Sequence, residues 1–337
     1  MGADTSPLRP ETIDQLQQAV AAAQRVLLSG PVDPDGDSIG ACLGLAQMIR
    51  ACSSARVEVA GSAAYRYAWL DGASDMVPDA AILPDYDVVI IMDGDRRRLV
   101  PTVERAFLAA PRTVLVDHHA STEPEGYDIV LLDPSAASTT AMVDGIRERW
   151  GLPLDPRLAA ALYTGLIFDT GGFRHSNTRP STLALAARLI ETGIDHATIS
   201  VRVLVERRPA GLRLLGAVLE RVRFTAEGRV CLGAVQESDF VCHGADGTDL
   251  EGIVDALVYT RGVEVACLLV ERGPARVKLS LRSRTDTIDV SRVARSFHGG
   301  GGGHPRAAGV VLEVPLEEAL RLVTQALDLA VARVFAA

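Results

Sequence analysis

Residues 26–37, VLLSGPVDPDGD, decide the fold, because a short apolar run leads directly into a cluster of acidic side chains. The run at 26–29 has the length and composition of a buried strand. Asp33, Asp35 and Asp37 follow at two-residue spacing around a proline and a glycine. Carboxylates at this spacing on an extended segment can reach two neighbouring cations. A solvated turn is the alternative for this segment taken alone.

The spacing excludes a calcium-binding EF-hand loop. That loop places glycine at its sixth position and glutamate at its twelfth, where a count from Asp33 finds Ser38 and Gly44. The pattern instead predicts a helix over about 38–50, with Ser38 as its cap.

Three further apolar runs, at 56–60, 87–92 and 113–116, are separated by segments of helical pattern. Strands that are almost entirely apolar predict a parallel sheet covered on both faces, so the fold class is α/β. Ligands of such sheets bind beyond the carboxyl ends of the strands. Asp93 and the triplet Asp117-His118-His119 follow two of these runs, so we expect them to share one edge with the first aspartates.

The residue types at this edge predict a pair of metal ions. Two adjacent histidines after an aspartate suit a transition metal, and a neighbouring carboxylate commonly fixes the tautomer of a ligating histidine. Asp169 ends another apolar segment and is followed by Thr-Gly-Gly and by Arg174, for which a glycine-terminated helix is the alternative. Paired ions bound by carboxylate and imidazole hydrolyse phosphoesters, and an oxygen-rich ligand set favours Mn²⁺ over zinc.

The C-terminal part of the chain predicts a second, smaller α/β domain. We expect a catalytic metal-binding domain at 1–190, a helical linker at 191–215 and a substrate-binding domain at 216–337. The last contains a hairpin near 227–228, strands at 263–272 and 276–283, and the glycine tract HGGGGGHPRAAG at 298–309. Bare backbone amides beside His304 can cradle a phosphate, with Arg282 and Ser283 as further donors, although a glycine run can also be a flexible linker.

The composition restricts the partners. The chain has 337 residues, 48% apolar, with a net charge of −9, whereas a protein that grips long nucleic acid is usually basic. No apolar stretch approaches the length of a membrane helix, and the N-terminus lacks a secretory pattern. Five cysteines without a C-x-x-C motif fit a reducing cytosol, so we expect a cytoplasmic protein with a small anionic substrate.

In combination and order, six motifs resemble those of the DHH phosphoesterases with a DHH-associated C-terminal domain, and more narrowly the nanoRNase and pAp-phosphatase branch. The motifs are PDGDSIGA at 34–41, Asp93, the triplet at 117–119, FDTGGFRHSNT at 168–178, SLRS at 280–283 and GGGH-x-x-AAG at 301–309. Inorganic pyrophosphatases share the N-terminal design, but the last two motifs argue against them.

The resemblance implies two Mn²⁺ ions in a cleft between the two domains, with Asp93 bridging them. It implies that Asp117 orients His118 and that His119 lies near the scissile phosphate. The metal ligands would be Asp35, Asp37, Asp93, His118 and Asp169. The substrate-binding residues would be Arg174, Arg282, Ser283, Gly302, Gly303 and His304.

One departure concerns the first motif. The branch usually carries a ligating histidine where this chain has Pro31, and proline cannot ligate through its side chain. We hypothesise that Asp33 or a water supplies the missing ligand, as an aspartate does in the RecJ-type nucleases; a weakened first site is the alternative. A second departure is the lengthened glycine tract with an additional His298.

The family implies a Mn²⁺-dependent phosphodiesterase that cleaves very short 5′-phosphorylated oligoribonucleotides, such as pGpG or pApA, to mononucleotides. Hydrolysis of pAp or of cyclic di-AMP stays open, as does a homodimer. A nucleotide-binding sensor with weakened catalysis is the alternative of another class. We expect no long duplex nucleic acid and no membrane among the partners.

Overall fold

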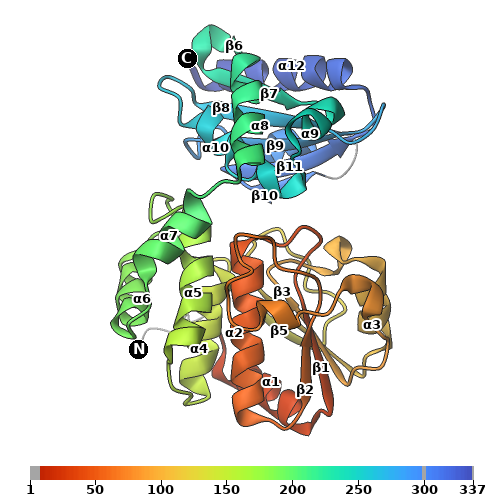
Figure 1. The fold of residues 1–337 in the computed structure, drawn as a ribbon, viewed down its shortest axis with the longest axis vertical. Helices are drawn as coiled ribbons and strands as arrows, with labels where there is room; N and C mark the ends of the chain where they lie inside the picture. The colour runs from red at the N-terminus through yellow and green to blue at the C-terminus, as the bar shows by residue number, and fades with distance from the viewer. Residues whose placement is uncertain (1–7, 298–300, 336–337) are drawn as a thin grey trace. The chain divides into compact units, whose positions relative to one another are not determined.

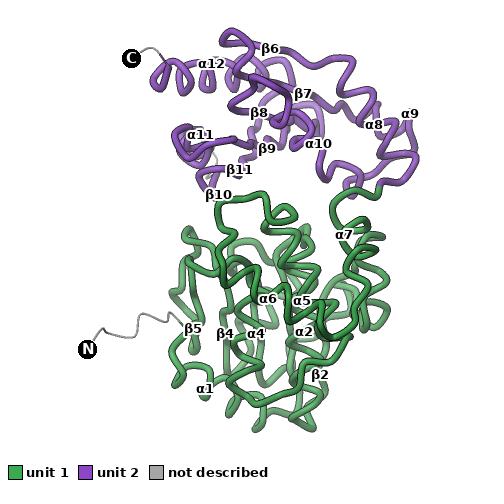
Figure 2. The backbone as a smooth tube through the Cα atoms, turned by 90° about the vertical axis from the view of Figure 1, so that its left-hand side faces the viewer, with its two compact units in different colours: residues 1–206 green, residues 207–337 purple. Residues whose placement is uncertain are grey.

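The computed structural model describes residues 8–297 and 301–335, and the chain divides into two compact units, 1–206 and 207–337 (Figure 2). The division lies inside the segment 191–215 that was expected to be a separate linker. Helix α7 (His196–Leu204) belongs to the first unit and helix α8 (Pro209–Glu220) to the second. His298 lies outside the described residues.

The first unit contains a five-stranded sheet in which every strand pair is parallel. Its strand order is β2-β1-β3-β4-β5. The strands are β1 (Arg25–Ser29), β2 (Arg56–Val59), β3 (Val88–Met92), β4 (Arg112–Asp117) and β5 (Ile129–Leu132). The four strands expected from the apolar runs are therefore present, and the parallel arrangement is confirmed.

Helices cover both faces of this sheet (Figure 1). Alternate residues of β1 show the division, since Val26 and Leu28 belong to one apolar cluster and Leu27 to the other. The first cluster includes α1 (Pro10–Ala22), α2 (Gly36–Cys52), α4 (Thr139–Arg149), α5 (Pro156–Asp169), α6 (Pro180–Glu191) and α7; the second includes α3 (Pro101–Ala109). Within the first, α2 packs directly against α5.

Helix α2 begins two residues earlier than the sequence predicted. Its N-cap is Asp35, whose side chain accepts hydrogen bonds from the backbone N–H groups of Asp37 and Ser38. The prediction that Ser38 caps this helix is therefore wrong. A carboxylate also caps well and favours the positive end of the helix dipole, which leaves the Ser38 hydroxyl available for another contact.

The second unit contains a six-stranded sheet in the order β10-β11-β9-β8-β7-β6, in which only the β7–β8 pair is parallel within the described residues. Its strands are β6 (Arg223–Thr225), β7 (Val230–Val235), β8 (Val265–Glu271), β9 (Val277–Ser283), β10 (Gly302–His304) and β11 (Ala307–Leu312). The described part of the glycine tract is thus a strand that pairs with β11, and not an open loop or linker.

The two faces of this second sheet are covered unequally. Helices α11 (Val290–Arg295) and α12 (Leu316–Phe335) contribute to an apolar cluster that includes residues of strands β7, β8, β9 and β11. On the opposite face, the cluster formed with α8 and α10 (Ile253–Val258) includes residues of β7 and β8. Helix α9 (Glu237–His243) packs against α8.

Short 3₁₀ segments lie at Ala73–Asp75, Asp79–Ala81, Arg96–Arg98, Ala226–Gly228 and Gly247–Leu250. In the described ranges, no helix combines the length and the apolar character needed to cross a bilayer.

Candidate metal centre and phosphate-binding strands

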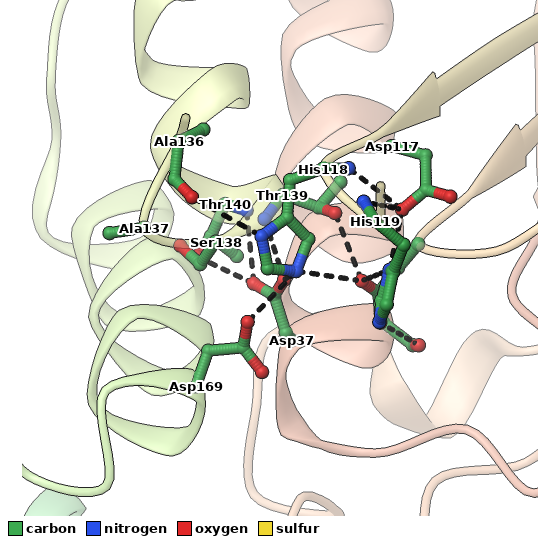
Figure 3. A network of polar contacts seen from close by, with 12 residues as sticks. Asp37, Asp117, His118, His119, Ala136, Ala137, Ser138, Thr139, Thr140 and Asp169 are labelled. Carbon is green, nitrogen blue, oxygen red and sulfur yellow. Dashed lines mark hydrogen bonds and ion pairs between the residues drawn. The ribbon is translucent and has the colours of Figure 1, made fainter. Parts of the chain in front are cut away.

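Asp37 lies in the first turn of α2 and is completely buried. Its Oδ1 accepts hydrogen bonds from the N–H (3.0 Å) and the hydroxyl (2.8 Å) of Thr140, and its Oδ2 accepts one from the N–H of Thr139 (2.6 Å). Both threonines begin α4, so the N-terminus of one helix holds a carboxylate of another (Figure 3). This arrangement fixes the carboxylate plane.

Asp93 follows β3 and is only 3% exposed. Its backbone has a left-handed φ of 58°, an uncommon conformation for a residue with a side chain. Its Oδ2 accepts from the hydroxyl of Ser38 (2.5 Å) and its Oδ1 from the hydroxyl of Thr139 (3.0 Å). The Ser38 hydroxyl thus contacts a carboxylate and does not cap the helix.

His118 points from the end of β4 into this cluster of carboxylates (Figure 3). Its Nδ1 lies 3.3 Å from the carbonyl oxygen of Ala136, which favours a proton on that nitrogen. Its Nε2 faces the carboxylates of Asp169 (2.9 Å), Asp93 (3.7 Å) and Asp37 (3.9 Å). An imidazole held in this way directs Nε2 toward any cation bound among the carboxylates.

Asp117 holds the ring of His119. Its Oδ1 accepts hydrogen bonds from the N–H groups of His118 (2.7 Å) and His119 (3.1 Å) and from Nδ1 of His119 (2.7 Å). Its Oδ2 accepts from the hydroxyl of Thr122. We expected Asp117 to orient His118; it accepts a hydrogen bond from the backbone N–H of that residue, whereas Nδ1 of the His118 ring faces the carbonyl of Ala136.

Asp169 is the last residue of α5, and two later side chains hold its backbone. Its carbonyl oxygen lies 3.0 Å from Nδ1 of His175 and accepts a hydrogen bond from the side-chain amide of Asn177 (3.2 Å). That amide also donates to the carbonyl of Ala137 (2.9 Å). Asn177 therefore ties the end of α5 to the loop that precedes α4. Arg174 lies exposed on the same loop.

The electrostatics of the cluster favour a bound cation. Burial, together with the charges of Asp93 and Asp169, raises the pKa of Asp35 to about 8 and raises that of Asp37 well above its usual range. Burial opposes a charge on His118, but the neighbouring carboxylates, Asp169 first, outweigh it and raise the pKa of this histidine. Carboxylates that retain protons, and a histidine that gains one, indicate more negative charge than the fold itself neutralises.

Two groups of ligand atoms in the first unit are close enough to hold an ion. The atoms of Asp37, Asp93 and His118 lie within 4.8 Å of one another, and so do those of Asp93, Asp117 and His119. Asp93 belongs to both groups, and its Oδ1 lies 3.7 Å from Nε2 of His118 and 3.7 Å from Nδ1 of His119. Asp37, Asp93 and His118 therefore fit one cation, and Asp93 lies where a second, neighbouring cation could share its carboxylate.

Pro31 and Asp33 occupy the loop between β1 and α2. Pro31 is buried, and a Cβ built on Gly94 would lie 3.4 Å from its ring. The proline therefore packs against the loop that carries Asp93. Asp33 is exposed and has a left-handed φ of 58°. The groups of ligand atoms found in the first unit do not contain Asp33, whose role as a replacement ligand remains a prediction.

In the second unit, Arg282 and His304 share one face of the sheet. Arg282 of β9 pairs with Ala307 of β11, and Ala307 pairs with His304 of β10, so the three lie in one cross-strand row. The central alanine leaves space between a guanidinium and an imidazole. Nε of Arg282 lies 3.4 Å from Asp255 of α10, which orients the guanidinium.

Ser283 lies on the opposite face of the sheet from Arg282, since successive residues of a strand alternate. It is buried, and its hydroxyl donates to the carbonyl of Thr285 (2.8 Å). Arg282 and Ser283 were expected to hold one phosphate together, and the structure divides them between the two faces. The alternation of β9 could have revealed this from the sequence.

The fold requires glycine at position 303 but not at position 302, the two positions that precede His304. Gly303 has a φ of 136°, and a Cβ there would lie 2.3 Å from the carbonyl oxygen of Ala307, so the hairpin itself requires glycine. A Cβ on Gly302 would meet no described atom within 4 Å. Packing among the described residues therefore does not require a glycine at 302, which is consistent with a ligand approaching its backbone.

Comparisons with known proteins agree with this division into two units. A family model described as "DHH family, N-terminal domain" matches residues 25–166, and one described as "DHHA1 domain" matches residues 234–333. The bifunctional oligoribonuclease and PAP phosphatase NrnA of Thermus thermophilus is 30% identical over 302 residues, which cover 89% of this chain and 88% of that protein. The chain belongs to the DHH family.

Two further DHH-family comparisons extend this result. The cyclic-di-AMP phosphodiesterase GdpP of Geobacillus thermodenitrificans is 25% identical over 351 residues, which cover 97% of this chain and 52% of that protein. The crystal structure of an exopolyphosphatase-related protein from Bacteroides fragilis is similar with a TM-score of 0.84 and 26% identity, over 96% of this chain and 97% of that one. The family and the α/β fold expected from the motifs are thus confirmed.

Proposed function

We propose that this protein is a Mn²⁺-dependent phosphodiesterase that hydrolyses very short 5′-phosphorylated oligoribonucleotides, such as pGpG or pApA, to mononucleotides. The broader class, a hydrolase of phosphoester bonds, follows from membership of the DHH family and from the names of its relatives. The choice of metal, the number of ions and the dinucleotide substrate are the proposal.

The observation that carries the proposal is the position of Asp93, which is shared by two groups of ligand atoms. Asp37, Asp93, His118 and Asp169, with Asp35 at the start of α2, would hold the ions. Carboxylate oxygens dominate this set, and they favour Mn²⁺ over zinc. Two such ions, when bound, neutralise charge on a phosphate and lower the pKa of water at the site.

His119 is the residue of the chain that we place at the scissile phosphate. Its Nδ1 faces Asp117, so Nε2 is the nitrogen directed to substrate. Burial opposes a charge on the ring, but the contact with Asp117 and the charge of Asp93 outweigh it and raise the pKa of His119 to about 9. At neutral pH the ring would therefore hold a proton at Nε2 and donate a hydrogen bond to a phosphate oxygen.

The second unit would bind the terminal 5′-phosphate, and so would measure the length of the substrate. Arg282 offers a planar pair of donors, His304 lies in the same cross-strand row, and the backbone at Gly302 and Gly303 can approach closely. Arg174 of the first unit would also contact the substrate. Ser283 shapes the turn after β9 in this account and does not contact the phosphate through its hydroxyl.

A turnover panel tests the proposal. The purified protein is incubated with Mn²⁺ and, separately, with pGpG, longer RNA, pAp and cyclic di-AMP, and the products are separated by chromatography. We expect pGpG to give mononucleotides fastest, and Asp93→Ala to abolish turnover while the protein remains folded. Faster release of phosphate from pAp would instead favour the PAP phosphatase activity named for one relative. Faster opening of cyclic di-AMP would favour the cyclic-di-AMP phosphodiesterase activity named for another.

Pro31 is the observation that favours the alternative of another class, a nucleotide sensor. A proline in place of a ligating side chain would weaken one metal site. Binding of pGpG without any mononucleotide product would support the sensor and contradict the enzyme.

A further inference from the structure

Thr139 contacts two carboxylates that come from different parts of the fold. It is the first residue of α4 and is completely buried. Its backbone N–H donates to Oδ2 of Asp37 (2.6 Å), and its hydroxyl donates to Oδ1 of Asp93 (3.0 Å). Asp37 follows β1 and Asp93 follows β3, so a single residue connects the ends of two strand-to-helix segments.

The hydroxyls of Thr139 and Ser38 together fix the orientation of the Asp93 carboxylate. A carboxylate at the end of a strand can rotate about its last side-chain bond. Here Ser38 donates to Oδ2 and Thr139 donates to Oδ1, so both oxygens are fixed. The oxygen that Thr139 holds is also the one that lies 3.7 Å from both His118 and His119. Each carboxylate oxygen has two lone pairs, so one hydrogen bond on each leaves one lone pair on Oδ1 and one on Oδ2, which is enough for two cations.

The neighbouring Thr140 has a different set of contacts. Its N–H and its hydroxyl both donate to the same oxygen, Oδ1 of Asp37. Thr140 therefore supports a single ligand, whereas Thr139 connects the ligand Asp37 to the ligand that the two groups share. Serine and threonine at the start of a helix are common caps, so the sequence alone does not distinguish these roles.

We propose that Thr139 is a positioning residue that aligns Asp93 as the shared ligand of two neighbouring cations. This inference rests on the proposed two-ion function. Partners of metal ligands orient the ligand atoms, and their loss typically lowers metal affinity about 10- to 100-fold. Loss of the Thr139 hydroxyl releases Oδ1 of Asp93, while the N–H that holds Asp37 stays in place. The second ion to bind is therefore affected more than the first.

The test substitutes Thr139→Val, which keeps the shape and the N–H and removes the hydroxyl. Thr139→Ser restores the hydroxyl, and Thr139→Ala removes it without the branched side chain. Thr164→Val is the matched control, because Thr164 is equally buried but donates its hydroxyl to the carbonyl of Ala160 within α5. Metal-free protein is titrated with Mn²⁺ by calorimetry, and the bound ions are examined by electron paramagnetic resonance.

The wild type, Thr139→Ser and Thr164→Val should bind two ions per chain and show the spectrum of a magnetically coupled pair. Thr139→Val and Thr139→Ala should bind the second ion at least about 10-fold more weakly and show isolated ions at the same Mn²⁺ concentration. Wild-type affinity and a coupled spectrum in both variants would overturn the inference. A wild type that binds fewer than two ions would instead overturn the proposed function.

Discussion

Gly165 of α5 provides a sharp test of the packing around the metal centre. A Cβ at this position would lie 2.3 Å from Oδ1 of Asp37, 2.4 Å from Cγ2 of Thr140 and 2.6 Å from its hydroxyl oxygen. Ordinary contacts between such atoms lie near 3.5–4.0 Å, so Gly165→Ala must move the carboxylate or the helix by about 1 Å. We therefore expect this substitution to disturb both stability and ion binding.

The expected magnitude has opposing contributions. In an open helix interior, replacing glycine by alanine raises the free energy of unfolding by up to about 1 kcal/mol. Overpacking a close helix contact costs about 1–3 kcal/mol. Loss of one hydrogen bond to the buried Asp37 carboxylate costs a further ~1.5–3 kcal/mol. The net expectation for Gly165→Ala is a free energy of unfolding about 3 kcal/mol lower, with weaker binding of Mn²⁺.

Tryptophan fluorescence during urea unfolding of the metal-free protein provides the assay. The sequence has two tryptophans, Trp69 and Trp150, and both lie in the first unit with Gly165. Gly145→Ala in α4 is the matched control, because its methyl would meet only the end of the Leu8 side chain, at 3.2 Å, among the described residues. The control should match or exceed wild-type stability. Gly165→Ala with wild-type stability and wild-type Mn²⁺ affinity would refute the reasoning.

Three further predictions concern protons, the first motif and the second unit. In metal-free protein, Asp35 (pKa about 8) and His119 (pKa about 9) bind protons more tightly in the folded state than in the unfolded state. The thermal unfolding midpoint should therefore decrease as the pH is raised from about 6.5 to about 9. Saturating Mn²⁺ should flatten this fall, and a midpoint that rises with pH in its absence would contradict the assignment. Asp33→Asn should lose one Mn²⁺ per chain by elemental analysis, and retention of two ions would sink the idea that Asp33 replaces the missing histidine. Arg282→Ala should raise KM for pGpG about 10-fold or more, since a charge-assisted contact contributes ~1.5–3 kcal/mol. The same substitution should leave KM unchanged for the dinucleotide that lacks the 5′-phosphate. Equal effects on both substrates would argue against a 5′-phosphate contact.

Much of the first unit could be predicted from the sequence, because its strands are continuous apolar runs. The carboxyl ends of parallel strands share one edge, so Asp37, Asp93 and His118 could be expected together before the structure was known. The structure brings them within 4.8 Å of one another. Asp169 was expected at the site on different grounds, the end of an apolar segment and the family motif; that segment is helix α5, and the Asp169 carboxylate contacts His118.

The supporting residues could not be predicted in this way. Thr139 and Thr140 contact Asp37 across more than a hundred residues of sequence, and their hydroxyls carry no signal beyond that of a helix start. Serine and aspartate cap helices about equally well, so the sequence does not decide between Ser38 and Asp35 as the cap of α2. The three-dimensional contact with Asp93 explains why the serine hydroxyl is used elsewhere.

The glycine tract shows a different limit. A run of glycines predicts either a loop or a linker when it is read alone, because glycine gives no pattern of alternation. Its pairing with β11 makes residues Gly302–His304 a strand, and this long-range contact decides the conformation. The alternation of β9, by contrast, was visible in the sequence and already separated Ser283 from Arg282.

The most direct test of the central claim is the Mn²⁺ content of the wild type and of Asp93→Ala, measured at equilibrium by elemental analysis on protein of verified fold. If Asp93 is the shared ligand of two neighbouring ions, the wild type should hold two ions per chain and the variant at most one. Two tightly bound ions in Asp93→Ala, or a single ion in the wild type, would contradict the account.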